Sequence, residues 1–539
     1  MKKIVIICLL SCSVYLMGQE VPESLAIKMA NAYYQEVKNA RGDTLTFSSA
    51  NNTLRAQRFS PLGKANMWFV PVEDGWILLS GNMKMSPVLA HIQSHERPMY
   101  ASFPPAAQEL LNVYEENLAY INQHESDFSV DQRWQDVDSD ESVNRSSTSA
   151  LTEVRLTMDV HWGQTIAPGG CNRAYNKFCP PVNAPLQCNK AAAGCVAVAI
   201  AQIMWYWKWP YAAYIPTTVG GSNTELKFYD WSMMPSQISS GTPMSHVNMI
   251  AGLLRDCGYS LDMDYGVSSG ASSSDALSTL ESYGYNSDDM ELRSKWNTSG
   301  WTNKLRSNID NGQPVYYAGQ SAAVGGSGHA FIVDGYRTGN NPTYHINWGW
   351  YNNNDGWYNI DDAYVDSDLH YEYHQEAIFG IRPTPLCTDG IYNGSFPQKF
   401  CLVRGGDIIM ANNTLSNISE GKIYSSTKVR LTSGVTIQNG SNVHIAIKAV
   451  PCNTSGGPEY NSISVHNSKK DVIVSKINQE TQTDIPELSQ VLIYSIDGKL
   501  LRQTSDLRTA QEALSNGIYI IKALTRDGKL YQSKIFINN

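Results

Sequence analysis

The chain has 539 residues, a formal net charge of -9 and 17% charged residues. Its length exceeds that of one ordinary domain, so we expect about three or four folded units. Acidic and basic residues are evenly mixed and form no basic stripe, which argues against a nucleic-acid partner. Thirty Tyr and thirteen Trp among many Gly, Ser and Asn favour an extracellular, β-rich protein.

The first residues have the pattern of an export signal. Two lysines precede an apolar run over residues 4–10, and small residues follow near Gly18. The run is far shorter than the roughly 20 residues that a membrane-spanning helix needs. We therefore expect residues 1–18 to be a signal peptide. A lipoprotein cleavage site at Cys12 is the alternative, and no other segment has the composition of a membrane span.

Ten cysteines are present, and two of them fall in the predicted signal peptide. The others are Cys171, Cys179, Cys188, Cys195, Cys257, Cys387, Cys401 and Cys452. Exported chains can form disulfides. The first three could pair among themselves, as could Cys387 with Cys401, but spacing alone does not decide the connectivity. No Cys-x-x-Cys pair occurs, so a structural zinc site is not expected.

Residues 19–148 have the pattern of a compact α+β unit. Residues 24–39 and 105–123 show helical periodicity, and residues 68–79 form two short strands around a turn. The unit ends in residues 136–149, a Ser-, Asp- and Glu-rich stretch without periodicity. Such a stretch is typical of an exposed linker that proteases cut.

Gly-, Trp- and Tyr-rich segments with a few helices occupy residues 149–385, where the residues suited to catalysis lie. Short alternating strands follow, which predicts a β-rich module over residues 386–465 and a β-sandwich over residues 466–539. In the strand-like run 435–449, the Asn-Gly pair at 439–440 predicts a hairpin turn.

A continuous helix-forming run extends from Ala191 to Trp205 and is apolar nearly all round, which predicts a buried central helix. Cys195 lies in its first turn. Unpaired backbone N–H groups and the positive end of the helix dipole favour a thiolate there, which would make Cys195 a nucleophile. Taken alone, the residue would more often be a small buried hydrophobe or half of a disulfide.

His329 stands where a glycine-rich loop meets a predicted strand, and a second strand downstream ends in Asn347 and two tryptophans. An imidazole that takes a proton from a thiol needs a polar group on its other nitrogen to fix its tautomer. Asn347 can supply that group, and Trp348 or Trp350 can shield the bond. His345 is the competing base, and a purely structural role for His329 is the alternative.

Upstream of the helix, Gln164 lies in the short polar segment 161–165. Its amide can donate a hydrogen bond to an oxyanion beside the backbone N–H of Cys195, an interaction worth on the order of 3 kcal/mol per donor. Without the rest of the pattern, Gln164 would be an ordinary surface residue.

Taken together, these segments resemble the streptopain family of papain-like cysteine peptidases. The blocks that carry the resemblance are residues 162–164, 193–197, 262–270, 328–335 and 347–350. Their order, Gln, Cys, His and Asn-Trp, is also the papain order. The resemblance implies an α+β fold of two lobes, in which a helical lobe presents Cys195 and a twisted antiparallel sheet presents His329.

The resemblance also implies roles for individual residues. The catalytic set is Cys195 as nucleophile, His329 as base, Asn347 and Trp348 as the orienting and shielding pair, and Gln164 as oxyanion donor. The substrate-binding set is Ser269, Gly270, Ala271, Gly328 and Trp350. Ala318 stands where streptopain carries a glutamine, and Ala271 replaces a serine, so the subsite preference is open. Residues 19–148 resemble the family's inhibitory propeptide more loosely.

The region from Val491 resembles the sorting domains of the type IX secretion pathway of Bacteroidetes, with residues 494–499 and 516–520 as the matching pieces. This resemblance implies contact with the secretion machinery and a secreted or cell-surface location. A plain adhesive β-sandwich is the alternative.

The sequence thus predicts a secreted cysteine endopeptidase that acts on protein or peptide substrates through a thioester. We expect it to be made as a zymogen inhibited by its own propeptide, without cofactor, metal or nucleic acid. The alternatives are another Cys-His acyl-transfer enzyme, such as a transglutaminase or a cell-wall amidase, and a surface adhesin with an inactive peptidase domain.

Overall fold

The structure is a computed structural model. It describes residues 20–43, 55–94, 96–138, 150–294, 300–320, 328–360, 374–383, 390–432, 434–438 and 440–448, and the strands at 460–464, 472–475, 488–495, 500–504, 517–525 and 530–537. The predicted signal peptide, the linker from residue 139 to 149, Cys387 and Cys452 lie outside the described residues. None of the helices described is long and apolar enough to cross a membrane.

The chain divides into two compact units. The first comprises residues 1–208, 215–225 and 229–382, and the second comprises 209–214, 226–228 and 383–539. The first unit therefore contains both the predicted propeptide and nearly all of the predicted catalytic segment.

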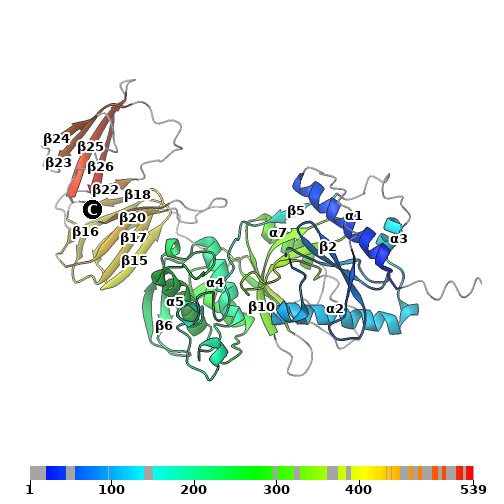
Figure 1. The fold of residues 1–539 in the computed structure, drawn as a ribbon. Coiled ribbons are helices and arrows are strands. Elements are labelled where there is room, and N and C mark those ends of the chain that lie inside the picture. Colours follow the sequence, from blue (N-terminus) through cyan, green and yellow to red (C-terminus); the bar gives the residue numbers. More distant parts are fainter. Residues whose placement is uncertain are drawn as a thin grey trace, which may run out of the picture. The chain divides into compact units, whose positions relative to one another are not determined.

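The N-terminal part of the first unit is α+β, as expected. Its elements are α1 (Glu23–Arg41), β1 (Gln57–Phe59), β2 (Met67–Val72), β3 (Gly75–Ser80), β4 (Val88–Ile92), α2 (Pro105–Gln123) and α3 (Gln132–Asp138). Alternate residues of β2 face opposite ways: Trp68 and Val70 pack with α1, whereas Met67 and Phe69 pack with α2. The two helices thus cover opposite faces of the strands (Figure 1).

The strands of the predicted propeptide and those of the catalytic segment form one hydrogen-bonded sheet. The latter are β5 (Glu153–Arg155), β8 (Glu291–Ser294), β9 (Val315–Gln320), β10 (Gly328–Arg337), β11 (Thr343–Asn347), β12 (Gly356–Tyr358) and β13 (His374–Phe379). The order is β1-β2-β3-β4-β12-β11-β10-β9-β13-β8, and β5 pairs with β10. The join is antiparallel, with Trp357 of β12 opposite His91 of β4. One hydrophobic core spans both parts, so residue 148 does not separate two cores.

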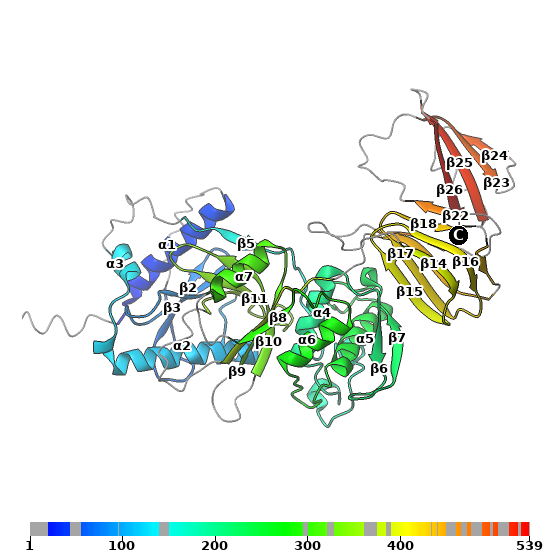
Figure 2. The ribbon, with the colours of Figure 1, turned by 180° about the vertical axis from the view of Figure 1, so that it is seen from behind.

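A helical lobe lies beside this sheet (Figure 2). It contains α4 (Cys195–Trp207), α5 (Met244–Ser260) and α6 (Ser273–Ser282), while α7 (Trp301–Asp310) packs on strands of the sheet. Helix α4 packs against α5, α6 and β10. The expected two-lobed α+β architecture, with a buried helix next to a largely antiparallel sheet, is therefore present.

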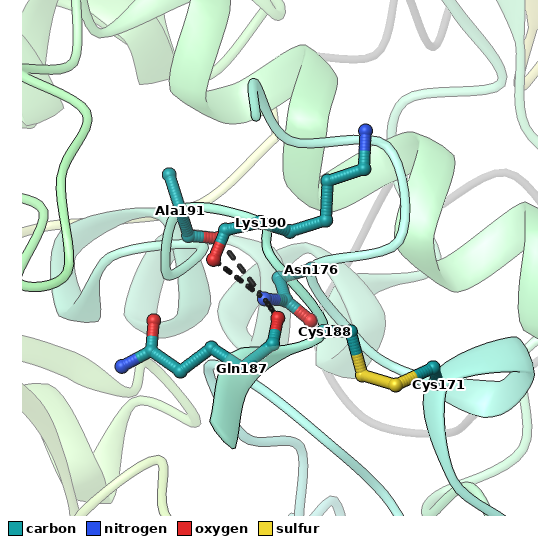
Figure 3. The surroundings of a disulfide bond; sticks show 6 residues. All are labelled: Cys171, Asn176, Gln187, Cys188, Lys190 and Ala191. Atoms are coloured by element: carbon teal, nitrogen blue, oxygen red, sulfur yellow. Dashed lines mark hydrogen bonds between the residues drawn. A yellow bond between two sulfur atoms is a disulfide. The ribbon is translucent and has the colours of Figure 1, made fainter. Parts of the chain in front are cut away.

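A disulfide joins Cys171 to Cys188, with a Cα–Cα distance of 5.4 Å (Figure 3). This pairing resolves the three-way choice that the sequence leaves among Cys171, Cys179 and Cys188. Cys179 is buried and free. The suggested pair of Cys387 with Cys401 involves a residue outside the described part of the chain.

The second unit begins with a parallel coil, in which successive strands belong alternately to two sheets. Its strands are β14 (Gly390–Ser395), β15 (Lys399–Arg404), β16 (Ile408–Leu415), β17 (Glu420–Ser425), β18 (Lys428–Leu431), β19 (Thr436–Ile437), β20 (Val443–Lys448), β21 (Tyr460–Ser464) and β22 (Val472–Ser475). From β14 to β18 the chain alternates between two sheets, so neighbours within each sheet run parallel. Residues 209–214 belong to this unit, where the ring of Tyr211 lies 5.0 Å from that of Tyr424.

The hairpin predicted in residues 435–449 is wrong. Gly440 does turn the chain, with a φ of +84°. However, β19 pairs with β16 and β20 pairs with β17, in different sheets. The turn therefore closes one step of a parallel coil and not two antiparallel neighbours.

The last four strands form an antiparallel sheet of their own. They are β23 (Leu488–Ser495), β24 (Leu500–Thr504), β25 (Gly517–Thr525) and β26 (Leu530–Ile537), in the order β24-β23-β25-β26. The strand-like runs expected near residues 491–496 and 518–522 fall in β23 and β25.

Candidate active site

Cys195 is the first residue of α4. The preceding Gly194 has φ +88° and ψ 138°, a conformation that residues with a Cβ rarely adopt. A Cβ at Gly194 would lie 2.7 Å from the Met263 Cε and 3.3 Å from the Ser269 carbonyl oxygen. The glycine lets the chain enter the helix while a second loop lies alongside. Helix formation therefore begins at Cys195, whereas the sequence run suggests a start near Ala191.

The residues just before Cys195 bind two of the segments singled out in the sequence. The backbone N–H of Ala193 donates to the Gln164 carbonyl at 2.8 Å, and that of Ala192 donates to the Gly266 carbonyl at 3.1 Å. These backbone bonds bring the Gln164 segment and the loop around Gly266 beside the thiol.

The segment that leads to Cys195 is also held by the side chain of Asn176, which is fully buried. Its Nδ2 donates to the carbonyl oxygens of Gln187 at 3.1 Å, Lys190 at 3.4 Å and Ala191 at 3.1 Å. Figure 3 shows this amide pointing at the three carbonyls beside the disulfide. The backbone between the end of the disulfide-closed loop at Cys188 and the start of α4 is therefore held by hydrogen bonds from Asn176.

The Cys195 thiol and the His329 imidazole interact, and each shifts the pKa of the other. Burial opposes ionisation of the Cys195 thiol, but the charge and hydrogen bond of His329, with the backbone N–H groups of Ala330 and Val196, lower its pKa overall. Burial likewise lowers the pKa of His329, but the Cys195 thiolate and the Trp348 carbonyl raise it overall. The two shifts have opposite signs and favour a thiolate-imidazolium pair. Cys195 remains partly exposed and forms no disulfide.

The second nitrogen of the imidazole has a backbone partner. His329 Nε2 lies 3.1 Å from the carbonyl oxygen of Trp348. A carbonyl only accepts hydrogen bonds, so Nε2 carries a proton and donates it. This leaves Nδ1 for Cys195, which is the arrangement that proton transfer from the thiol requires.

Asn347 does not orient the imidazole directly, contrary to the sequence-based expectation. Its Oδ1 accepts from the Gly349 N–H at 2.9 Å and from Gln202 Nε2 at 3.2 Å, and its Nδ2 donates to the Val160 carbonyl at 2.6 Å. The N–H of Gly349 and the carbonyl of Trp348 belong to one peptide group. Asn347 therefore binds the peptide that in turn binds His329.

Trp348 places its indole in the core of the sheet, fully buried. The ring centroid lies 4.8 Å from that of Phe331 and 5.1 Å from that of Tyr358. The Nε1–H donates to the Asn354 carbonyl at 3.2 Å. This packing fixes the residue whose carbonyl oxygen receives the imidazole, while a shielding role for the indole stays a prediction.

The predicted substrate-binding residues flank this centre from several elements. Ser269 is buried, and its Oγ donates to the Ala192 carbonyl at 2.8 Å. Gly270 is exposed and forms an isolated bridge with Asp264. Gly328 is the exposed first residue of β10, Ala271 is half-buried, and Trp350 packs at the edge of the core. Their contacts with substrate stay predictions.

Gln164 is buried, and its carbonyl binds Ala193 as described above. The segment is thus next to the nucleophile, and the oxyanion role of the Gln164 amide stays a prediction. Among the residues that the structure describes, no three His, Cys, Asp or Glu side chains are grouped as metal ligands.

Comparison with known proteins adds independent support. Residues 170–358, which include Cys195, His329 and Asn347, match the Peptidase C10 family. Residues 170–358 thus form a cysteine peptidase segment of the streptopain family, Peptidase C10. The match covers the nucleophile helix, the strand that carries His329 and the strand that ends at Asn347, just before Trp348.

Two curated relatives are similar to this chain. The thiol protease/hemagglutinin PrtT of Porphyromonas gingivalis is 30% identical over 284 residues, which are 49% of this chain and 32% of that protein. Streptopain of Streptococcus pyogenes is 26% identical over 313 residues, which are 54% of this chain and 72% of streptopain. The chain thus spans about a third of the length of PrtT.

Two solved structures from Prevotella intermedia are also similar. A prointerpain A fragment is 21% identical with a TM-score of 0.45, covering 62% of this chain and 100% of the fragment. Active interpain A is 26% identical with a TM-score of 0.34, covering 42% of this chain and 94% of that protein.

His345, the competing base, lies within β11 and away from the thiol. Its Nδ1 hydrogen-bonds to the buried Asp334, and its ring lies 5.2 Å from that of Trp357. The residue is buried within β11, where it pairs with Gly335 and Trp357. The structure therefore brings His329, and not His345, to the thiol.

Three polar residues near the site are absent from the sequence-based prediction. Gln202 is fully buried in α4, and Asp355 Oδ1 accepts from the Trp348 N–H at 2.9 Å. His161 Nδ1 lies 3.7 Å from Asp355 Oδ2. Burial lowers the pKa of His161, but the carboxylates of Asp355 and Asp159 raise it overall. A polar Gln inside an otherwise apolar helix is the signal that points to Gln202.

Proposed function

We propose that this C10 peptidase is a secreted cysteine endopeptidase, made as an inhibited precursor, with Cys195 as nucleophile and His329 as base. The interaction of Cys195 with His329, whose other nitrogen is bound by the Trp348 carbonyl, carries the proposal. The lowered pKa of the thiol and the raised pKa of the imidazole favour the charged pair that attacks a carbonyl without a further proton transfer.

In the first half of the reaction, the Cys195 sulfur attacks the carbonyl carbon of the scissile peptide bond. The resulting oxyanion lies near the start of α4, where the backbone N–H of Cys195 and the Gln164 amide are the proposed donors. His329 then gives the Nδ1 proton to the leaving amine nitrogen as the C–N bond breaks. The products are a free amine and a thioester on Cys195.

In the second half, neutral His329 takes a proton from water, which attacks the thioester carbon. The C–S bond breaks, the carboxylic product leaves, and Cys195 departs as a thiolate beside the imidazolium. The starting pair is restored without any other reactant. The Trp348 carbonyl can accept from Nε2–H throughout, so the tautomer stays fixed during both proton transfers.

We further propose that residues 19–148 act as the inhibitory propeptide. Support comes from the continuous sheet across β4 and β12 and from the shared core. The N-terminal part also reaches the Trp348 loop, because Asn354 Nδ2 donates to the Ser102 carbonyl at 2.9 Å while the Asn354 carbonyl binds the Trp348 indole. Release of this segment is proposed to require cleavage within residues 136–149.

The export route belongs to the proposal as well. We propose a cleaved signal peptide at residues 1–18 and a type IX sorting role for residues 466–539. The separate four-stranded sheet β23–β26 supports a distinct C-terminal module. Expression of the full chain and of a chain shortened by these 74 residues (539 minus 465) in a host with this pathway tests the role. Export of both forms to the same extent would contradict it.

Mass spectrometry of the purified precursor tests the proposed chemistry. Wild-type protein should digest casein to peptides with new free N-termini and should cut itself within residues 136–149. Cys195→Ala should do neither. Cys257→Ala is the matched control, because burial raises the pKa of that thiol well above its ordinary range. Incorporation of added amines without peptide cleavage would instead indicate an acyl-transfer enzyme.

A further inference from the structure

Gln202 lies on the same face of α4 as Cys195, about two helical turns further along. Its side chain is fully buried in a helix that is otherwise apolar at its buried positions. A buried amide is costly unless its donor and acceptor atoms find partners. The partners of Gln202 therefore show what this residue contributes.

Each end of the Gln202 amide binds a different part of the site. Oε1 accepts from the backbone N–H of Trp162 at 2.9 Å, two residues before Gln164. Nε2 donates to Asn347 Oδ1 at 3.2 Å. One side chain on the nucleophile helix thus binds the proposed oxyanion segment and the strand end that precedes Trp348.

The bond to Asn347 continues to the catalytic base. Asn347 Oδ1 also accepts from the Gly349 N–H at 2.9 Å, and the carbonyl of the same peptide group accepts from His329 Nε2 at 3.1 Å. The peptide lies directly on α4, because a Cβ at Gly349 would be 3.0 Å from Val198 Cγ1 and 3.8 Å from Gln202 Nε2. An unbroken series of hydrogen bonds and one shared peptide group therefore connects the Gln202 amide to the imidazole.

We propose that Gln202 is a positioning residue, which sets the places of the oxyanion segment and of the imidazole-binding peptide relative to the Cys195 thiolate. This inference rests on the proposed peptidase function. The amide touches neither substrate nor the reacting atoms. It acts through Trp162 on one side and through Asn347 and the Trp348–Gly349 peptide on the other.

Gln202→Glu gives the sharpest test, since the change keeps an acceptor for Trp162 and replaces the donor to Asn347 by an oxygen. An ionised carboxylate at this position would repel Asn347 Oδ1, whereas a protonated carboxyl group can donate to it. We expect kcat on a peptide substrate to fall about 10- to 100-fold near neutral pH with KM changed less than about twofold. The deficit relative to wild type should shrink as the pH falls.

Asn308→Asp is the matched control. Asn308 is buried, its Nδ2 donates to the Lys304 carbonyl at 2.9 Å, and its Oδ1 accepts from the Gly380 N–H at 2.7 Å. The change likewise keeps an acceptor and removes a donor, but on α7, outside the site. It should lower the melting temperature and leave kcat and its pH dependence as in wild type.

A second variant covers the case in which Gln202→Glu does not fold. Gln202→Met keeps the length of the side chain without charge, and we expect a similar fall in kcat that does not recover at low pH. Wild-type kcat and KM are measured alongside, so that an inactive wild type rejects the peptidase function itself. An active wild type with folded Gln202 variants that match Asn308→Asp in kcat and pH profile would overturn the positioning role alone.

Discussion

His329 Nε2 lies 3.1 Å from the carbonyl oxygen of Trp348, so a backbone group fixes the tautomer of the imidazole. A carbonyl cannot change its protonation state or rotamer, and it can only accept. Side chains therefore affect the orientation of the imidazole only by holding the peptide group between Trp348 and Gly349 in place.

Asn347→Ala should reduce activity without abolishing it. The change removes the acceptor for the Gly349 N–H and the donor to Val160, but the Trp348 carbonyl still receives His329. We expect kcat to fall about 10- to 100-fold, because the peptide moves and the imidazole moves with it. Steady-state kinetics on a peptide substrate measures this, with His329→Ala as reference. An Asn347→Ala enzyme as inactive as His329→Ala would show that the side chain acts directly.

Gly194→Ala should destabilise the protein and reduce activity. The backbone at Gly194, with φ +88° and ψ 138°, costs a residue with a Cβ on the order of 1–3 kcal/mol. The new methyl group would also press on Met263 and on the loop of Ser269 beside the thiol. We expect a lower melting temperature together with a kcat at least about tenfold lower.

The control for this change is Gly170→Ala. Gly170 has a similar strained backbone, with φ +75° and ψ -164°, but a Cβ there would meet no atom within 4 Å. It should lower the melting temperature and leave kcat unchanged. Equal effects of both variants on kcat would argue against a specific role for the chain path at Gly194.

Removal of the disulfide should lower stability more than activity. Cys171 and Cys188 close a loop with a sequence separation of 17. A crosslink of that span contributes about 3 kcal/mol in the chain-entropy view. The double variant Cys171→Ala/Cys188→Ala should therefore melt earlier, with kcat near wild type, since Asn176 still binds the carbonyls that lead to α4. Calorimetry and kinetics on both forms check this.

Asn176→Ala should instead lower activity while the disulfide remains intact. It removes the side-chain donor to the carbonyls of Lys190 and Ala191, and one of the two donors to the Gln187 carbonyl, while the disulfide stays closed. We expect kcat to fall because the backbone before Cys195 loosens. Normal kcat in Asn176→Ala, or loss of activity in the double cysteine variant, would contradict a positioning role for Asn176 and a purely stabilising role for the disulfide.

Acid should weaken the junction between the N-terminal and catalytic parts through His91. This buried residue lies with Nε2 3.0 Å from Asp74 Oδ1 and Nδ1 3.0 Å from a guanidinium nitrogen of Arg337. Arginine only donates, so Nδ1 accepts and the ring is neutral. Burial lowers the pKa of His91; the bond to Asp74 raises it, and the charges of Arg337 and Arg41 lower it.

Because the folded state disfavours protonation of His91, the unfolded state binds the extra proton. This contribution to stability is fully present above the ordinary histidine pKa of about 6.5 and is lost as the pH falls below it. The stability advantage of wild type over His91→Gln should therefore shrink from neutral toward mildly acidic pH in thermal unfolding. A difference independent of pH would contradict this account. His161 and His329 have raised pKa values and act in the opposite direction in both proteins.

Local patterns predict the elements that carry the chemistry. The apolar run after Gly194 predicts a buried helix with Cys195 in its first turn, and the glycine-rich stretch before His329 predicts a strand start. Both are observed. The helices expected at residues 24–39 and 105–123 are likewise present as α1 and α2. Periodicity suffices here because each element is defined by its own residues.

Contacts that depend on tertiary structure cannot be predicted from local sequence patterns. The acceptor for His329 is a backbone carbonyl, which every residue possesses, so Asn347 looks like the better partner in sequence. The pairing of β4 with β12 joins strands more than 260 residues apart, with Trp357 opposite His91, and no local pattern encodes it. The Asn-Gly pair before β20 signals a turn, but whether a turn closes a hairpin or a parallel coil depends on which strands lie beside it.

The pH dependence of Cys195 alkylation by iodoacetamide, followed by peptide mapping, tests the central claim most directly. In the full-length protein the thiol should react well below the ordinary cysteine pKa of about 8.5, because His329 stabilises the thiolate. In His329→Gln the reaction should shift upward by at least about one pH unit toward that ordinary range. Identical profiles near the ordinary cysteine range in both proteins would contradict a thiolate-imidazolium pair.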